Sequence, residues 1–327
     1  MTRLDVLVTR PIMDGPLARL RERCDVTIHE NDFGIPREEL LGVVAGRDAL
    51  VTMLTEKVDA ELLAASGPQL KIVANHAVGF DNIDVPACTA AGVLATNTPD
   101  VLTETTADTA FALLLAAARR VGEGERLLRA RTPWIWGPLM MLGQDVHHKT
   151  IGIVGFGRIG QAVARRARGF GMTVLYTDAV TLPADVETET GARRVSMDEL
   201  LAQADFISIH TNLTPQTRHL FGTEQFRAMK PTAVLVNTSR GPVVDEAALA
   251  EALATGELFA AGLDVFEREP QVEEGLLDLE RAVVIPHLGS ATVDTRNAMG
   301  NLVVDNVFAA LDGVRPPTLL NPDAFTG

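Results

Sequence analysis

Side chains that could protonate or bind a substrate follow several apolar, strand-like runs of the sequence. His76, His210 and His287 close the stretches "KIVANH", "FISIH" and "VVIPH". In open α/β sheets, ligands bind beyond the carboxyl ends of the strands, so each of these histidines is a candidate for acid/base chemistry. A neutral, hydrogen-bonded structural histidine is an equally good interpretation of each position. Spacing alone does not choose among the three.

An arginine and three acidic residues follow two later runs. Arg240, in "NTSRGPVVD", would offer a planar guanidinium fork to a carboxylate, with a salt bridge to a neighbouring helix as the alternative. Asp264 ends the run "AAGLD". Glu267 and Glu269, in "DVFEREP", are either surface charges or partners of a catalytic group, and the sequence does not decide between the two glutamates.

A glycine-rich turn follows the strand-like run that starts at Thr150. The segment "TIGIVGFGRIGQAVARR" places Gly155, Gly157 and Gly160 in the spacing GxGxxG, directly before a helical pattern. The first glycine permits a tight turn, the second lets the backbone approach a pyrophosphate, and the third lets the helix pack on the strand. The motif also occurs in simple turns, so its place between a strand and a helix is what predicts a dinucleotide site.

Asp178 ends the next strand-like run, "MTVLYTD". A carboxylate in this place accepts hydrogen bonds from both ribose hydroxyls of a dinucleotide and repels a 2′-phosphate. The four residues after Asp178 include no arginine that could bind such a phosphate. The sequence therefore favours NAD over NADP, with a simple turn cap as the alternative role of Asp178.

Two arrays of strand-like runs alternate with helical patterns. The runs of the first array are 4–9, 25–28, 49–53, 70–74 and 93–96, and those of the second are 150–155, 173–177, 206–210, 233–237, 260–264 and 282–285. Such alternation predicts parallel sheets covered by helices. We expect an α/β protein with two doubly wound domains and a cleft between them. The predicted domains are a flavodoxin-like substrate domain over residues 1–99 and 289–327 and a Rossmann-type dinucleotide domain over 100–288.

The region between the arrays has a different pattern. Residues 99–128 are rich in Ala and Leu and predict one long helix, apolar nearly all round and so buried between layers or between subunits. The loop that follows, "TPWIWGPLMMLGQDV", carries both tryptophans of the chain. So apolar a loop is expected to be covered by a partner subunit or to line the substrate pocket.

Composition excludes several classes of protein. The 327 residues carry a formal net charge of -14, which argues against nucleic acid or an anionic membrane as a partner. The two cysteines are too few for a disulfide framework and match no metal motif, so no metal is predicted. No apolar run reaches the length that spans a bilayer, and the first residues read as a strand and not as a signal peptide. We therefore expect a cytoplasmic protein.

Four motifs in this order, "GFGRIG", "NTSRGPVVDE", "GLDVFEREP" and "PHLGSAT", resemble those of the D-isomer-specific 2-hydroxyacid dehydrogenases. The resemblance covers essentially the whole chain, including "VGFDNID" in the first array, and looks closest to the glyoxylate/hydroxypyruvate reductase branch. It implies NADH-dependent reduction of a small 2-keto acid to the D-2-hydroxy acid, and a homodimer.

The resemblance also implies roles for residues at matching motif positions. Arg240 would bind the substrate carboxylate and polarise the ketone, Glu269 would orient a histidine, and His287 would be the acid/base. His76 and His210 would then line the pocket or the cofactor site. The implied substrate contacts also include Leu54, Val78 and Gly79. The implied cofactor contacts, besides the three glycines and Asp178, are Thr106, Arg158, Ile159, His210, Thr238, Asp264 and Gly289.

Related proteins on the same scaffold leave alternatives open. D-Lactate, 3-phosphoglycerate, formate or phosphite could be the substrate, or the chain could be an NAD(H)-sensing corepressor that recruits proteins. Glu269 argues against formate, a missing regulatory domain against phosphoglycerate, and the short tail "PDAFTG" against a corepressor. D-Lactate and phosphite stay open.

Overall fold

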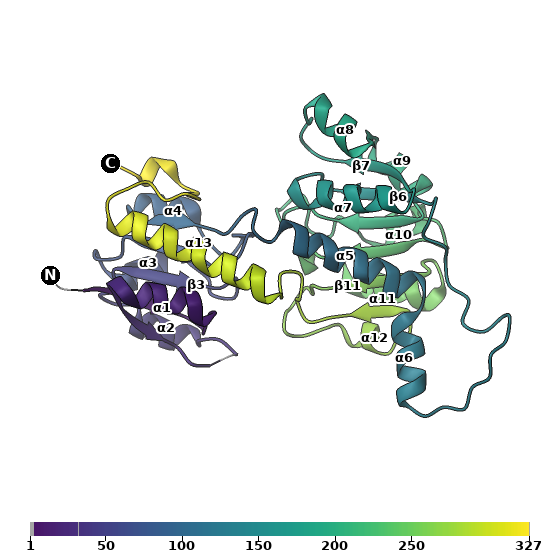
Figure 1. Cartoon of the computed structure of the whole chain (residues 1–327), viewed down its shortest axis with the longest axis horizontal. Coiled ribbons are helices and arrows are strands. Elements are labelled where there is room, and N and C mark those ends of the chain that lie inside the picture. Colours follow the sequence, from purple (N-terminus) through teal and green to yellow (C-terminus); the bar gives the residue numbers. More distant parts are fainter. Residues whose placement is uncertain (1–2, 32, 327) are drawn as a thin grey trace. The chain divides into compact units, whose positions relative to one another are not determined.

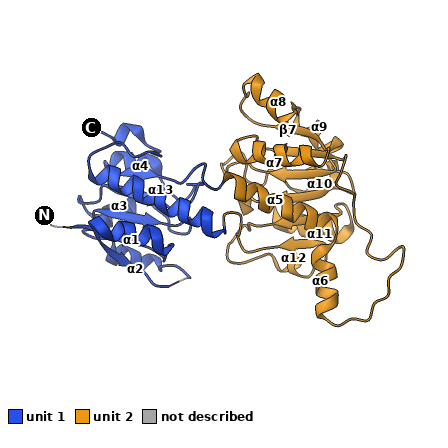
Figure 2. Cartoon of the chain, in the orientation of Figure 1, with its two compact units in different colours: residues 1–102, 291–327 blue, residues 103–290 orange. Residues whose placement is uncertain are grey.

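The chain folds into two compact units, which Figure 2 shows in different colours. The structure is a computed structural model that describes residues 3–31 and 33–326. Unit 1 contains the described residues up to Leu102 and from Ala291 onward, and unit 2 runs from Thr103 to Ser290. The domain boundaries predicted from the sequence lie between residues 99 and 100 and between residues 288 and 289.

Unit 1 is built on a five-stranded parallel sheet with the strand order β2-β1-β3-β4-β5. This is the flavodoxin-like order. Its strands are β1 Leu4–Val8, β2 Cys24–Ile28, β3 Ala49–Thr52, β4 Ile72–Asn75 and β5 Leu94–Thr96. Its helices are α1 Asp14–Arg23, α2 Arg37–Val43, α3 Ala60–Ser66, α4 Val85–Ala90, α13 Val293–Leu311 and the short 3-10 helix Pro322–Ala324.

Unit 2 is built on a seven-stranded parallel sheet with the order β12-β11-β10-β9-β6-β7-β8. Its strands are β6 Thr150–Val154, β7 Thr173–Thr177, β8 Ala192–Arg194, β9 Phe206–Ile209, β10 Val234–Asn237, β11 Ala260–Leu263 and β12 Ala282–Val284. Its helices are α5 Thr103–Ala118, α6 Val121–Arg129, α7 Arg158–Gly169, α8 Ala184–Thr190, α9 Met197–Gln203, α10 Thr223–Ala228, the 3-10 helix Gly241–Val243, α11 Glu246–Thr255 and α12 Glu274–Leu277.

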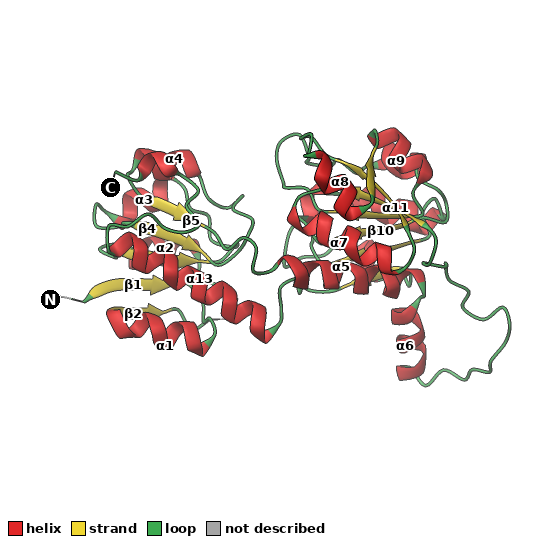
Figure 3. Cartoon of the chain, turned by 45° about the horizontal axis from the view of Figure 1, so that its top comes forward, coloured by secondary structure: helices red, strands yellow, loops and turns green. Residues whose placement is uncertain are grey.

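Helices cover both faces of each sheet, and Figure 3 shows the strands enclosed between them. In unit 1, α1 and α13 pack on one face and α2, α3 and α4 on the other, because each helix buries one apolar side. In unit 2, α5 and α7 cover one face, while α9, α10, α11 and α12 cover the other. The prediction of two doubly wound parallel-sheet domains is confirmed.

The central strands are apolar because both of their faces are buried. All four residues of β3, β4, β9, β10 and β11 are buried. The edge strand β8 has the sequence ARR and exposes both arginines, so the sequence analysis missed it.

The prediction of one helix over residues 99–128 is wrong. The chain forms α5 and α6, separated at Arg120, whose backbone adopts the left-handed conformation at φ 54°. Arg120 is held there by hydrogen bonds to both carboxylate oxygens of Glu123. Helix α5 buries eight of its residues, whereas α6 buries none and projects from the body of unit 2 (Figure 1).

None of the helices in the described part of the chain is long and apolar enough to cross a membrane.

Candidate active site

The glycine-rich turn follows β6, and the surroundings of its three glycines differ. Gly155 has φ +88°, and a Cβ there would lie 2.7 Å from backbone atoms of His210. A Cβ on Gly160 would lie 2.3 Å from the carbonyl oxygen of Gly155, so the packing of α7 on the turn also requires glycine. Apart from Gly157 itself and its two neighbours in the chain, no atom of the described residues lies within 4 Å of a Cβ position on Gly157. Packing therefore requires glycine at the first and third positions, whereas at the second position the backbone borders open space.

This turn can hold a diphosphate group. Gly157 caps α7, and the first N–H groups of a helix have no partner within the helix. An anion there is also stabilised by the helix dipole, and α7 is twelve residues long. Arg158 and Ile159 form the first turn of α7, and the side chain of Arg158 is exposed. The open space at Gly157 and this helix end fit the pyrophosphate of a dinucleotide.

Asp178 follows β7 and joins the end of that strand to the glycine-rich turn. Its Oδ2 accepts a hydrogen bond from the Phe156 N–H at 2.6 Å, and its Oδ1 accepts one from the Val180 N–H at 2.9 Å. The carboxylate thus caps a local turn and also stands beside the glycine-rich turn. The two roles considered for Asp178 do not exclude each other.

An arginine that was not predicted from the sequence binds the loop of Asp178. Arg194 lies on β8, opposite Tyr176 of β7. Its Nη2 donates to the carbonyl oxygen of Asp178 and its Nη1 to Oγ1 of Thr181, both at 2.7 Å. The four residues after Asp178 do contain no arginine, but an arginine distant in the sequence binds this loop. The pairing of β7 with β8 brings in a cation that the residues directly after Asp178 do not supply.

Further predicted cofactor residues follow neighbouring strands of the same sheet. Nε2 of His210 lies 2.8 Å from Oγ of Ser208, whereas Nδ1 of His210 and Oγ1 of Thr238 are buried with no hydrogen-bond partner among the described residues. Burial lowers the pKa of His210 to about 3. Buried polar atoms without partners are costly, and a bound ligand would satisfy them. Together with the glycine-rich turn, they fit a nicotinamide dinucleotide.

His287 stands in a tight turn after β12 that Asp264 holds in place. The backbone of His287 is left-handed, with φ 52°, and its N–H donates to the carbonyl oxygen of Asp264 at 2.9 Å. The carboxylate of Asp264 accepts the next two N–H groups, from Leu288 at 2.5 Å and Gly289 at 2.8 Å. Burial raises the pKa of Asp264, which is 1% exposed. Asp264 therefore fixes the direction in which the His287 ring leaves the backbone.

Glu269 contacts the ring of His287 directly. Nδ1 of His287 lies 2.9 Å from Oε2 of Glu269, and the other carboxylate oxygen accepts the Phe266 N–H at 3.0 Å. Burial by itself raises the pKa of Glu269, but the hydrogen bond and charge of His287, the Phe266 N–H and the charge of Arg240 outweigh it and lower that pKa. Glu269 is therefore ionised at neutral pH.

The structure also separates Glu269 from its neighbour Glu267. Oε1 of Glu267 lies 2.5 Å from Nε2 of His219 and 3.9 Å from the guanidinium of Arg218. The two glutamates thus contact different histidines, a distinction that the sequence left open.

Arg240 follows β10 and lies against the segment that carries Glu269. Its Nη1 donates to the carbonyl oxygen of Ser239 at 2.8 Å, and its own carbonyl oxygen accepts from the Asn237 side chain at 3.0 Å. A Cβ on Gly241 would lie 1.8 Å from the carbonyl carbon of Phe266, so only glycine allows these two backbones to pack together. This contact holds the charge of Arg240 close enough to Glu269 to lower its pKa.

A buried glutamate, which the sequence analysis also missed, supports the same segment. Glu246, the first residue of α11, is 4% exposed. Its carboxylate accepts the N–H groups of Glu267 and Glu273, and so holds the backbone on both sides of Glu269. Burial raises the pKa of Glu246. A glutamate in the first turn of a helix is common, so its type and position alone do not reveal this role.

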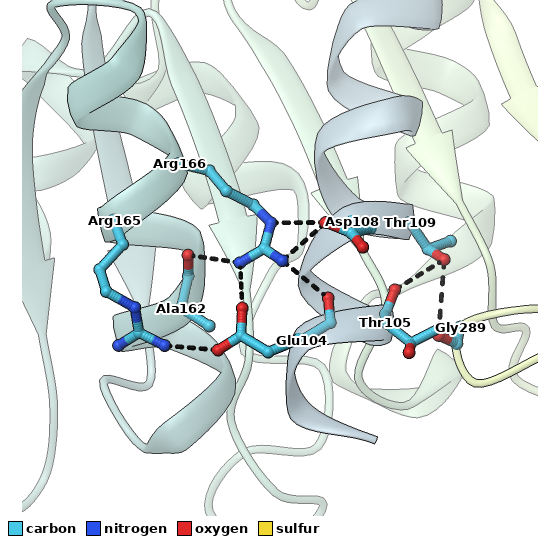
Figure 4. A network of polar contacts seen from close by, with 8 residues as sticks. All are labelled: Glu104, Thr105, Asp108, Thr109, Ala162, Arg165, Arg166 and Gly289. Carbon is cyan, nitrogen blue, oxygen red and sulfur yellow. Dashed lines mark hydrogen bonds and ion pairs between the residues drawn. The ribbon is translucent and has the colours of Figure 1, made fainter. Parts of the chain in front are cut away.

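Two arginines of α7 fasten this helix to α5, as Figure 4 shows. Glu104 accepts hydrogen bonds from Arg166 at 2.8 Å and Arg165 at 2.6 Å, and the bond from Arg166 is the largest cause of its lowered pKa. Thr109, further along α5, donates to the carbonyl oxygen of Gly289 at 3.4 Å. Helix α5, which also carries the buried Thr106, thus links the helix of the glycine-rich turn to the turn of His287.

The predicted substrate contacts Leu54, Val78 and Gly79 belong to unit 1, whereas the other predicted site residues belong to unit 2. Leu54 follows β3, and Val78 and Gly79 follow β4. The side-chain amide of Asn82 donates to the carbonyl oxygens of Met53 and Glu56, both at 3.0 Å. This residue therefore ties the two loops together at the carboxyl edge of the sheet of unit 1.

Comparisons with known proteins agree with this arrangement. The family model described as "D-isomer specific 2-hydroxyacid dehydrogenase, NAD binding domain" matches residues 111–289. A glyoxylate reductase from Thermococcus onnurineus is 51% identical over 98% of this chain and 96% of its own length. The crystal structure of a glyoxylate reductase from Paecilomyes thermophila has a TM-score of 0.88 at 36% identity, covering 98% of this chain and 99% of that one. An NADPH-dependent glyoxylate/hydroxypyruvate reductase from Sinorhizobium meliloti, in complex with NADP and malonate, has a TM-score of 0.84 at 33% identity, covering 99% and 98%.

The chain belongs to the D-isomer-specific 2-hydroxyacid dehydrogenases, a class of nicotinamide-dependent oxidoreductases. Within that class it lies in the branch whose members carry the name glyoxylate reductase.

Proposed function

We propose that the protein reduces a small 2-keto acid, glyoxylate or hydroxypyruvate, to the D-2-hydroxy acid with NADH. The observation that carries the proposal is the contact of 2.9 Å between His287 and Glu269, with Arg240 close by, in a unit that also has a dinucleotide-type glycine turn. The names of the relatives support the substrate class.

Arg240 binds the substrate. Its guanidinium holds the carboxylate of the keto acid and polarises the neighbouring ketone oxygen, because a planar fork offers donors to both groups. The substrate contacts that the family resemblance implies for Leu54, Val78 and Gly79 of unit 1 stay predictions.

His287 supplies the proton. Its Nδ1 is engaged by Glu269, so Nε2 is the atom that donates to the developing alkoxide oxygen at C2. NADH, when bound, supplies the hydride to C2, and hydride plus proton together complete the reduction of the ketone. The carboxylate of Glu269 orients the ring and stabilises its charged form.

The other two histidines that follow strands are poor proton donors. Burial, followed by the nearby charge of Arg296, lowers the pKa of His76 to about 4, and burial lowers that of His210 to about 3. Both rings are therefore neutral near pH 7. This leaves His287, with its carboxylate partner, as the acid among the three candidates.

We also propose that a second copy of the chain covers the exposed apolar side chains of α6 and the loop after it. In that loop Ile135 is 86% exposed, Trp136 76% and Leu139 81%, and on α6 Leu128 is 57% exposed. Light scattering should give the mass of a dimer. A dimeric mass that persists when Trp136 and Leu139 are both changed to Ser would contradict this assignment of the interface.

A panel of 2-keto acids assayed with NADH tests the main proposal. We expect glyoxylate and hydroxypyruvate to be reduced fastest, with D-glycerate as the product from hydroxypyruvate, and pyruvate to be reduced more slowly. A protein that binds NADH but reduces none of these acids would refute the proposed function. The cytoplasmic location stays a prediction from the sequence.

A further inference from the structure

The loop after β7 carries two opposite charges, on Asp178 and on Arg194 of the neighbouring strand. In the register of the two strands, Arg194 faces Tyr176, two residues before Asp178. The guanidinium of Arg194 spans the loop by its bonds to the carbonyl oxygen of Asp178 and the hydroxyl of Thr181. This loop follows β7, the strand beside the one that leads into the glycine-rich turn. In dinucleotide-binding domains the adenosine ribose binds at such a loop.

The charge of Arg194 is not paired with a carboxylate in the described part of the chain. Both of its guanidinium hydrogen bonds go to neutral oxygens, and only its backbone N–H donates to a carboxylate, that of Glu187 at 3.3 Å. The side chain is exposed. It can therefore bind an anion at this loop without first breaking an ion pair.

The neighbouring Arg193 differs in this respect. Its Nη1 forms an ion pair with Glu199 at 3.0 Å. Successive side chains of a strand point to opposite faces, so Arg193 does not share the surroundings of Arg194. Arg193 can therefore serve as the matched control for substitutions of Arg194.

Asp178 is more constrained than Arg194. Each of its carboxylate oxygens already accepts a backbone N–H, from Phe156 or from Val180. The carboxylate keeps further lone pairs for ribose hydroxyls, but its negative charge is partly balanced by these donors. A 2′-phosphate near this loop would meet that carboxylate together with the unpaired guanidinium.

We infer that Arg194 is a specificity-determining residue that binds the 2′-phosphate of NADPH, so that the enzyme accepts NADPH as well as the preferred NADH. The inference rests on the proposed function, because it concerns the adenosine end of the same dinucleotide site. Arg194 offers charge-assisted hydrogen bonds to a phosphate, while Asp178 keeps the preference for a free ribose hydroxyl.

Binding of adenosine fragments tests Arg194 independently of catalysis. Calorimetry would compare AMP with adenosine 2′,5′-bisphosphate, which differ only in the 2′-phosphate, for wild type, Arg194→Gln and Arg193→Gln. We expect Arg194→Gln to raise the Kd of the bisphosphate about tenfold, the usual loss for one charge-assisted contact, with AMP unchanged. Arg193→Gln should change neither Kd. The same pattern should appear when NADPH and NADH are titrated by fluorescence.

A second variant tests whether the effect of Arg194→Gln comes from a general loss of folding. Arg194→Lys keeps the positive charge and should retain most of the affinity for the bisphosphate. Equal effects of Arg194→Gln on both fragments, or no effect on either, would overturn the inference while leaving the proposed function intact. A wild-type protein that binds neither NADH nor AMP would instead overturn the proposed function itself.

Discussion

Replacing Glu269 by Gln should slow keto-acid reduction. The substitution keeps the size of the side chain and removes its negative charge next to Nδ1 of His287. The protonated ring then lacks the carboxylate that orients it and opposes its charge, so kcat/KM for reduction should fall. Because the pKa of Glu269 lies below its ordinary value, this carboxylate is ionised in the wild type from pH 5 to 9, and the loss should be present throughout that range.

The geometry gives the size of this effect. Two unit charges in such a contact attract by about 1 kcal/mol at the dielectric constant of water and about 4 kcal/mol at an effective value of 20. The side chains of His287 and Glu269 are 30% and 29% exposed, so solvent screening keeps the attraction near the lower of these two energies. A loss of about 1.4 kcal/mol corresponds to a factor of ten in rate. We therefore expect kcat/KM to be about tenfold lower in Glu269→Gln.

The assay is the rate of NADH oxidation with glyoxylate, measured as kcat/KM from pH 5 to 9. Glu267→Gln is the matched control, since its carboxylate contacts His219 and not His287, and its profile should match that of the wild type. An unchanged kcat/KM in Glu269→Gln, or an equal loss in Glu267→Gln, would refute the assignment of Glu269 as the partner of the acid.

Four other substitutions follow from the same geometry. His287→Asn should lower kcat by about 10²–10⁴, the usual contribution of one acid/base group, and an unchanged kcat would exclude His287 as the proton donor. Arg240→Lys should lower kcat/KM about 10²-fold because an ammonium lacks the fork, whereas Arg268→Lys, on an exposed side chain paired with Glu273, should have no effect. Gly160→Ala should lower the free energy of unfolding by about 1–3 kcal/mol, because its Cβ meets a backbone oxygen. Gly157→Ala has no such clash and should weaken NADH binding at unchanged Tm; a Tm that falls equally in both variants would contradict this reading of the turn.

The sequence predicted much of the fold because its signals are local. The eleven strands predicted from apolar runs agree with the observed ones to within two residues at each end. The twelfth, β8, was missed because a three-residue edge strand with two arginines has no apolar run. The break between α5 and α6 was missed because a left-handed Arg120, stabilised by Glu123, has no strong signal in composition.

For the site, the residues themselves gave candidates, and the family resemblance gave roles. His287, Glu269 and Arg240 were named in this way before any geometry was known. Glu246 and Arg194 were not, since a glutamate at the start of a helix and an exposed arginine are ordinary residues until their neighbours are known.

The sequence by itself determined the two parallel α/β arrays and the glycine-rich turn, because strand periodicity and the backbone freedom of glycine depend on residues adjacent in the chain. Residue types and spacing did not choose between Glu267 and Glu269, and tertiary structure shows that Glu269 contacts His287, 18 residues away, and that Arg194 contacts Asp178, 16 residues away. These pairs are set by strand register and by the path of the loops. The physical reason is that a side chain's partners depend on where distant backbone segments pack, which the order of residues along the chain does not specify.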